Sequence, residues 1–370
     1  MLKTPKKLKI IGLMSGTSMD GINSSFLITN GLSVLRKNYN NIYNYSEETS
    51  SLLREFEMNP NTLLQNLAKR INLNKLITID HANAVKFFCT KFKVKPDIIG
   101  FHGQTIVHNP KSQLSIQLGD GELLSKLTNT KVVYDFRTED IQNGGEGAPL
   151  APIYHKYLME ELDLKLPACF INIGGVSNIT YLDNTKLIGF DCGPGNALMD
   201  KLIQTKTNFL YDDGGKIAST GKVSGTVISK HLADKYFFKR FPKSIDKFDF
   251  IDILKTLEEK ELSLQDSLST LAEISALSIA QAIKILPQNP YNVVITGGGM
   301  YNSHLISRIK KHVKSKVRIL DKNFINGNYV ESELIAFLAA RVIYSFPNTF
   351  PSTTGVKKPI IGGKVIYIKA

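Results

Sequence analysis

Three short turns, each directly after an apolar run, carry the residue types that bind phosphate groups. The first spans 16–21, where Thr17 and Ser18 add hydroxyl donors; the others span 193–196 and 297–299. Backbone N–H groups in such turns form anion-binding nests, and glycine lets a phosphate approach closely. A single turn of this kind is more often structural. Three of them at strand ends predict a phosphate or nucleotide site, although G-x-x-x-x-G-K-[ST] and a convincing G-x-G-x-x-G after the first strand are absent.

The elements that must position these turns read as strands and helices in alternation. Apolar runs at 9–14, 187–190 and 292–296 predict buried strands that lead into the three turns. The order strand, glycine turn, strand at 8–28 recurs from 168 onward and hints at two related halves.

Further runs complete the predicted architecture. Short apolar stretches at 96–100 and 131–134 predict two more buried strands. Helical spacing over 263–286 and 331–344 predicts two helices, and Ser263 or Asp266 can cap the first of them. Strands that end in glycine turns and alternate with helices indicate an α/β fold.

Length, composition and charge set the class of protein. The 370 residues predict two domains at ~100–200 residues each. With 42% hydrophobic and 21% charged residues, collagen-like, coiled-coil and disordered chains are excluded. A net charge of +13 suggests a nucleic-acid or membrane partner. The basic residues are scattered lysines, however, without the basic and aromatic clusters that a nucleic-acid site needs, so we expect no nucleic-acid partner.

Cysteines and apolar segments predict the compartment. Cys89, Cys169 and Cys192 are odd in number and far apart, which argues against a disulfide scaffold or a cysteine zinc site. The apolar stretch 10–14 is too short for a signal peptide, and no segment approaches the ~20 residues of a bilayer helix. We therefore expect a cytoplasmic protein with no membrane partner.

Six motifs occur in a fixed order along the chain. They are MSGTSMDG at 14–21, GFHGQT at 100–105, DFR at 135–137, GAPLAP at 147–152, NIGG at 172–175 and FDCGPGN at 190–196. Together they resemble the anhydro-N-acetylmuramic acid kinase family, within the sugar kinase, actin and heat-shock-protein ATPase superfamily. The resemblance covers residues 11 to about 364, and the combination is specific although each fragment alone is not.

The resemblance implies an α/β fold of two duplicated actin-like, ribonuclease H-like lobes with a nucleotide cleft between them. The lobes would be residues 1–165 and 166–370, and the last helix could return to the first lobe. Family members open 1,6-anhydro-N-acetylmuramic acid with water and phosphorylate O6 from ATP, which yields N-acetylmuramic acid 6-phosphate in peptidoglycan recycling. The implied cofactors are ATP and Mg²⁺, the partner is the anhydrosugar, and a homodimer is possible.

The resemblance also assigns residues to the nucleotide. Two hairpins would grip the phosphates, and the third glycine turn would support the adenosine. The implied ATP-binding residues are Gly16, Thr17, Ser18, Met19, Asp20, Gly21, Ile22, Asn23, Gly174, Gly193, Gly195, Asn196, Gly297, Gly298 and Gly299. Magnesium keeps several of its waters in proteins, so Asp20 or Asp191 would hold it through water.

By the same resemblance, Asp191 matches the catalytic aspartate of the family. It follows the strand predicted at 187–190 and precedes a phosphate-type turn, so it should face the cleft. Attack of water on an anomeric carbon needs a general base, usually a carboxylate. From the residues alone, two other interpretations stay open: holding Mg²⁺ through water, and capping the next turn.

A sugar pocket is implied as well. Its residues would be Ser15, His102, Gln104, Arg137 and Glu333. His102 and Gln104 would lie in a loop after a strand, and Arg137 is suited to a bidentate grip on the lactyl carboxylate. The alternatives are a surface cation for Arg137, a structural histidine for His102, and for Glu333 a first-turn helix residue favoured by the helix dipole.

Two places depart from the family pattern. Cys192 stands where threonine is usual, so a strong hydroxyl donor is lost. The segment 243–249 keeps Lys243 and Ser244 but lacks the usual Thr-Gly. Neither change touches Asp191 or the nucleotide turns. The competing hypotheses are a related sugar kinase that opens no ring, and an actin-like or chaperone-like ATPase module that acts on protein.

Overall fold

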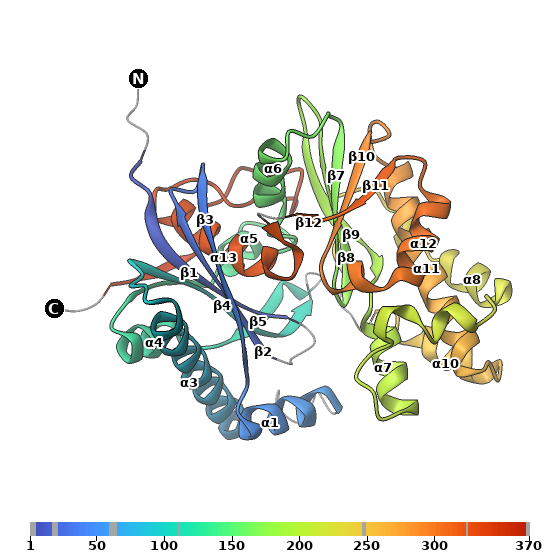
Figure 1. Cartoon of the computed structure of the whole chain (residues 1–370), viewed down its shortest axis with the longest axis horizontal. Coiled ribbons are helices and arrows are strands. Elements are labelled where there is room, and N and C mark those ends of the chain that lie inside the picture. Colours follow the sequence, from blue (N-terminus) through green and yellow to red (C-terminus); the bar gives the residue numbers. More distant parts are fainter. Residues whose placement is uncertain are drawn as a thin grey trace.

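The computed structural model describes residues 5–16, 21–58, 65–109, 112–245, 249–322 and 325–367. These form two β-sheets side by side, the first drawn mainly in blue and cyan and the second in green and orange (Figure 1). Helices cover the outer face of each sheet, and further helices lie between the two.

The first sheet has the strand order β14-β6-β4-β1-β2-β3, with β5 paired on β4. Strands β1, β2 and β3 form an antiparallel meander, whereas β4 runs parallel to β1 and β6 parallel to β4. The strands are β1 (Leu8–Ser15), β2 (Gly21–Thr29), β3 (Val34–Asn44), β4 (Ile98–Asn109), β5 (Leu114–Leu118), β6 (Lys131–Tyr134) and β14 (Lys364–Ile366).

The second sheet repeats this topology, in the order β11-β10-β7-β8-β9. Strands β7, β8 and β9 form the meander, β10 runs parallel to β7, and β11 parallel to β10. The path β3-β2-β1-β4-β6 therefore recurs as β9-β8-β7-β10-β11, which confirms the predicted α/β fold with two related halves. The strands are β7 (Ala168–Ile173), β8 (Val176–Leu182), β9 (Leu187–Pro194), β10 (Asn292–Thr296) and β11 (Lys316–Ile319), with a separate pair β12 (Asp321–Lys322) and β13 (Ile325–Asn326).

Helices occupy the remaining layers (Figure 1). In the first half and its connections they are α1 (Glu47–Met58), α3 (Leu67–Phe92), α4 (Gly121–Thr128), α5 (Thr138–Gln142) and α6 (Pro152–Glu161). The later helices are α7 (Ala197–Lys206), α8 (Gly225–Leu232), α9 (Lys235–Phe238), α10 (Asp252–Glu259), α11 (Leu264–Lys284), α12 (Ser303–His312) and α13 (Val330–Ile343). Short 3-10 turns are η2 (Asp213–Gly215), η3 (Ala218–Thr220), η4 (Gly298–Tyr301) and η5 (Gly327–Tyr329).

One hydrophobic cluster joins the two sheets through α6 and α13. It contains Ile10 and Val133 of the first sheet together with Phe170 and Val294 of the second. Helix α13 packs directly on β1, β2 and β4. It approaches so closely at Gly12 that a β-carbon there would lie 2.0 Å from the Ser332 carbonyl oxygen, so a residue without a side chain is required at this contact.

Most predicted elements match the structure, and two strands are longer than expected. The strands at 131–134 and 292–296 have the predicted bounds, and Ser263 Oγ caps α11 by accepting the Asp266 N–H at 3.1 Å. Strand β4 continues to Asn109 because its second part pairs with β5, so the prediction of a loop at His102 and Gln104 is wrong.

The predictions from cysteine and apolar content can also be compared with the structure. All three cysteines are free, and two of them are buried. None of the helices in the described part of the chain combines the length and apolar character needed to cross a membrane.

Candidate functional site

Asp191 lies inside β9, not at the end of a strand as the sequence suggested. The strand continues to Pro194 through a bulge: Asp191 pairs with Asn178 and Gly193 with Ser177, so Cys192 is the extra residue. A bulge of this kind bends a strand and redirects neighbouring side chains. The bulge therefore helps to set the direction of the Asp191 side chain.

The segment 243–245 and one tyrosine hold Asp191, so the expectation that the altered segment 243–249 does not touch Asp191 is wrong. The Asp191 N–H donates to the Lys243 carbonyl oxygen at 3.0 Å, and the Ile245 N–H donates to Asp191 Oδ2 at 3.1 Å. The Tyr236 hydroxyl donates to the Asp191 carbonyl oxygen at 2.6 Å. Burial raises the pKa of the Asp191 carboxyl to about 7, although the Ile245 amide and Arg137 oppose the shift. A carboxyl poised near neutral pH is suited to accept a proton in catalysis.

Arg137 and His102 form a hydrogen-bonded pair in the first half of the chain. Arg137 directs Nε and Nη2 at His102 Nε2, at 3.2 and 3.1 Å, and its Nη1 donates to the Gly147 carbonyl oxygen at 2.7 Å. His102 Nδ1 lies 2.9 Å from the Gly103 carbonyl oxygen, and burial lowers the pKa of His102 to about 3. The imidazole is therefore neutral, with its proton on Nδ1, and Nε2 accepts from the guanidinium.

Acidic groups of both halves act on the charge of Arg137. Burial lowers its pKa to about 10, opposed by Asp191, Asp140 and Glu331, so the guanidinium stays charged at neutral pH. The interpretation of Arg137 as a surface cation is wrong because its donors bind His102 and Gly147. Among the described residues each terminal nitrogen has one partner, so a second N–H on each could bind an anionic ligand.

Glu331 was not selected from the sequence but lies in this group. It is in the first turn of α13, and its Oε1 accepts from Asn172 Nδ2 of β7 at 3.0 Å. Burial raises the pKa of Glu331, while Asn172 and Arg137 oppose the shift. The only sequence signal was a pair of acidic residues two positions apart at a predicted helix start.

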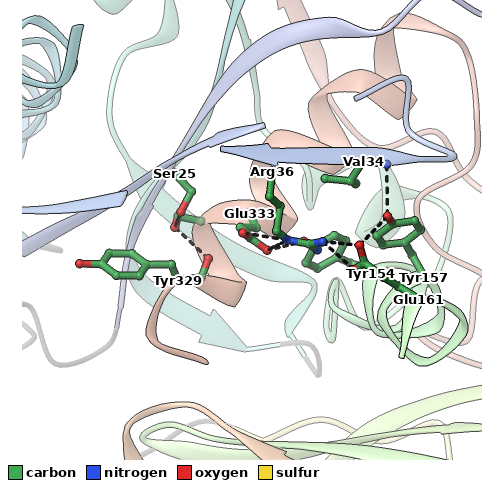
Figure 2. Close-up of polar contacts among 9 residues, drawn as sticks. Ser25, Val34, Arg36, Tyr154, Tyr157, Glu161, Tyr329 and Glu333 are labelled. Atoms are coloured by element: carbon green, nitrogen blue, oxygen red, sulfur yellow. Dashed lines mark hydrogen bonds and ion pairs between the residues drawn. The ribbon is translucent and has the colours of Figure 1, made fainter. Parts of the chain in front are cut away.

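Glu333, the acidic residue that was selected, is engaged elsewhere. Arg36 Nε donates to both of its oxygens, at 3.1 and 3.0 Å, and the Tyr154 hydroxyl donates to Oε2 at 2.5 Å (Figure 2). The same Arg36 bridges to Glu161 and Tyr154 of α6. The structure therefore does not bring Glu333 together with Asp191 and Arg137, because these internal partners occupy its carboxylate.

The second and third glycine turns lie next to each other. The Asn196 N–H donates to the Gly174 carbonyl oxygen at 2.8 Å and the Gly195 N–H to that of Gly175 at 3.0 Å. Gly193 follows the extra residue of the β9 bulge and pairs with Ser177. A β-carbon on Gly297 would lie 2.4 Å from Asn172 Oδ1, and one on Gly299 3.2 Å from Asn196 Nδ2.

This junction fits a bound nucleotide. A β-carbon on Gly298 would have only Asn196 Nδ2 within 4 Å, at 3.9 Å, so this backbone is open. Asn196 Oδ1 is buried and has no partner among the described residues. An open glycine backbone beside an unsatisfied amide, at the start of α7, can hold the adenosine and phosphate groups of ATP.

The first hairpin is described only up to its turn. Ser15 Oγ accepts from the Tyr45 hydroxyl at 2.7 Å and lies 3.1 Å from His81 Nε2, and Gln104 Nε2 donates to the Gly16 carbonyl oxygen at 3.0 Å. Ser15 and Gln104 thus support the hairpin from inside. On β2, Gly21 and Ile22 are buried, and Asn23 Oδ1 is buried without a partner in the described part of the chain. Thr17, Ser18, Met19 and Asp20 lie outside the described residues.

Comparison with known proteins identifies the family. The family model described as anhydro-N-acetylmuramic acid kinase matches residues 8–368 of the chain. The chain belongs to this family. Enzymes named anhydro-N-acetylmuramic acid kinase from Pelagibacter ubique and Zymomonas mobilis are 37% and 36% identical to it; the alignments cover 96% and 97% of this chain and 97% and 99% of theirs. The protein is therefore a sugar kinase that uses ATP and acts on a small molecule.

Likeness to solved structures is more distant. Component A of (R)-2-hydroxyglutaryl-CoA dehydratase from Acidaminococcus fermentans is 10% identical, with a TM-score of 0.47, over 90% of this chain and 98% of that chain. A likeness this distant adds nothing to the family assignment.

Proposed function

We propose that this kinase hydrolytically opens 1,6-anhydro-N-acetylmuramic acid and phosphorylates O6, which gives N-acetylmuramic acid 6-phosphate for peptidoglycan recycling. The observation that carries the proposal is that the buried carboxyl of Asp191, with its pKa raised to about 7, lies close enough to the charged Arg137 for each to affect the pKa of the other. The first supplies a base, and the second supplies a cation for the carboxylate of an acidic sugar. The names of the relatives give the substrate class.

The proposed reaction balances with one base. Asp191 takes a proton from water as the water oxygen bonds to C1 and the C1–O6 bond breaks. O6 then bonds to the γ-phosphorus of ATP, and ADP leaves. No separate acid is needed for the departing oxygen because it passes directly to phosphorus, and phosphoryl transfer depends mainly on positioning and charge neutralisation.

The nucleotide and metal would be held by groups of both halves. The turns at 16–21, 174–175, 193–196 and 297–299 are proposed to hold ATP. Mg²⁺, when bound with ATP, supplies positive charge at the phosphates, and Asp20 or Asp191 is proposed to hold it through water. The described residues contain no group of three possible His, Cys, Asp or Glu ligands, which fits an ion that keeps most of its waters.

The proposal also includes the boundary between the lobes, the cellular location and the oligomeric state. We place the boundary between the two lobes near residue 165, between α6 and β7, with α13 as a returning helix. The proposed location is the cytoplasm, where ATP is available. A homodimer follows from the family resemblance alone, and the mass of the protein in solution tests it.

The sugar contact gives a prediction. Arg137→Lys keeps the charge but loses the fork that binds His102 and Gly147, so the Michaelis constant for the anhydrosugar should rise about 10- to 100-fold, the value of one or two charged hydrogen bonds. The Michaelis constant for ATP should stay unchanged. Steady-state kinetics with each substrate varied in turn measures both, with Arg308→Lys, at an ion pair between α11 and α12, as the control. An unchanged constant for the sugar would remove Arg137 from the proposed pocket.

The pKa of Asp191 gives a second prediction. A base must be ionised to act, and burial raises this pKa to about 7. The value of kcat/KM, which reports the free enzyme, should therefore fall about tenfold for each pH unit below 7 and level off above it. Initial rates from pH 5 to 9 measure the profile. A flat profile between pH 5 and 7 would contradict the assignment.

The direct test of the proposed function uses purified protein, Mg-ATP and the anhydrosugar. Mass spectrometry should show a product that has gained one phosphate and one water. In heavy-oxygen water the label should appear at C1, because the bridge opens at that carbon. A phosphorylated product without label would instead identify a sugar kinase that opens no ring.

A further inference from the structure

A carboxylate that the proposed reaction does not use lies beside Asp191. Glu146 belongs to the glycine-rich loop between α5 and α6 and is half-buried. Its Oε2 accepts a hydrogen bond from Ser244 Oγ at 2.8 Å. Burial is the main cause of the raised Asp191 pKa, and the negative charge of the nearby Glu146 adds to it.

Ser244 is the central residue of the segment that holds Asp191. The residue before it, Lys243, accepts the Asp191 N–H with its carbonyl oxygen at 3.0 Å. The residue after it, Ile245, donates its N–H to Asp191 Oδ2 at 3.1 Å. Any group that fixes Ser244 therefore fixes both contacts of Asp191, the one to its backbone and the one to its carboxylate.

The loop around Glu146 is itself fixed from the other side. The Glu146 N–H donates to the Thr354 carbonyl oxygen at 2.7 Å, and the Gly147 N–H donates to Asp140 Oδ1 at 2.8 Å. The Gly147 carbonyl oxygen accepts from Arg137 Nη1 at 2.7 Å. Of these two adjacent loop residues, Gly147 thus binds the proposed sugar-binding arginine, and Glu146 binds the segment that supports the base.

We propose that Glu146 is a positioning residue: through its hydrogen bond to Ser244 it sets the place of Asp191 relative to Arg137. The inference rests on the proposed function, since it takes Asp191 as the base and Arg137 as the sugar contact. Glu146 takes no proton in the reaction and touches no substrate in this role. Small displacements of a reacting group are enough to matter, because misplacement by about 1 Å can lower a rate about a hundredfold.

Four variants test the proposal: Glu146→Gln, Glu146→Ala, Ser244→Ala and the double variant Glu146→Ala/Ser244→Ala. Glu146→Gln should keep kcat within about threefold of wild type, because the amide oxygen still accepts from Ser244. Glu146→Ala and Ser244→Ala should each lower kcat about 10- to 100-fold, with the Michaelis constant for ATP nearly unchanged. The double variant should be no slower than either single variant, because both remove the same contact.

Any of the following results would overturn the proposal. If Glu146→Gln is as slow as Glu146→Ala, the charge of Glu146 matters and not its hydrogen bond. If Ser244→Ala has the wild-type kcat, or the losses multiply in the double variant, Glu146 does not act through Ser244. Thermal unfolding checks that each variant is folded, and Ser244→Ala, which removes a single hydroxyl, keeps the test valid if Glu146→Ala does not fold. Failure of the wild type to convert the anhydrosugar would instead refute the proposed function.

Discussion

Asp191→Asn should lower kcat about 10³-fold while ATP still binds with nearly unchanged affinity. General base catalysis contributes about 10²- to 10⁴-fold, and an amide of nearly the same shape cannot take the proton from water. The Ile245 N–H can still donate to the asparagine oxygen, so the strand and the segment 243–245 should stay in place. The nucleotide turns bind one another through their backbones and do not depend on this carboxyl.

Release of ADP in the presence of the anhydrosugar measures the rate, and titration with a non-hydrolysable ATP analogue measures nucleotide affinity. Asp213→Asn is the matched control: it changes an aspartate paired with Lys216 on the surface and should leave both quantities unchanged. Normal turnover by Asp191→Asn would refute the mechanism. Loss of both turnover and ATP binding would instead point to the alternative role for Asp191, that of holding the metal.

Arg36→Met should lower the free energy of unfolding by about 3–5 kcal/mol, because it leaves the buried carboxylate of Glu333 without its cation. The Arg36 side chain is 6% exposed and that of Glu333 4%. Nε, Nη1 and Nη2 of Arg36 bind Glu333, Glu161 and Tyr154 respectively (Figure 2). The network ties β3 to α6 and α13, so its loss should weaken the layer of helices between the two sheets. Urea unfolding followed by circular dichroism measures the change.

Two controls separate the effect of burying a charge from the effect of losing an ion pair. Lys69→Met removes one member of the ion pair with Glu55, where both side chains are about 40% exposed, and should cost only about 0–1 kcal/mol. The double variant Arg36→Met/Glu333→Leu removes both buried charges and should recover much of the lost stability, because apolar groups can replace a buried pair. Equal effects of Arg36→Met and Lys69→Met would show that the buried network is not a major source of stability.

The structure agrees with several predictions that depended on local patterns. Strand β10 and helix α11 are bounded by changes in apolar periodicity, and Ser263 caps the helix as its position suggested. Predictions at β4 and β9 failed in one way: both strands continue past the residues where the apolar run ends. Pairing with β5 extends β4, and pairing with β8 extends β9 through its bulge. The polar residues of these strands pair with the neighbouring strand of the hairpin, which the apolar pattern of one strand does not reveal.

The sequence by itself determined the α/β class, the repeated meander and the turns that surround the candidate site, because short-range periodicity and glycine placement encode them. Only the tertiary structure decided which acidic residue of α13 joins that site. Glu331 and Glu333 are both first-turn residues, but side chains two positions apart on a helix diverge by about 200°. One meets Asn172 of the second sheet, and the other meets Arg36 of the first. The direction in which α13 packs between the sheets makes that choice, and many contacts distant in the sequence set it together.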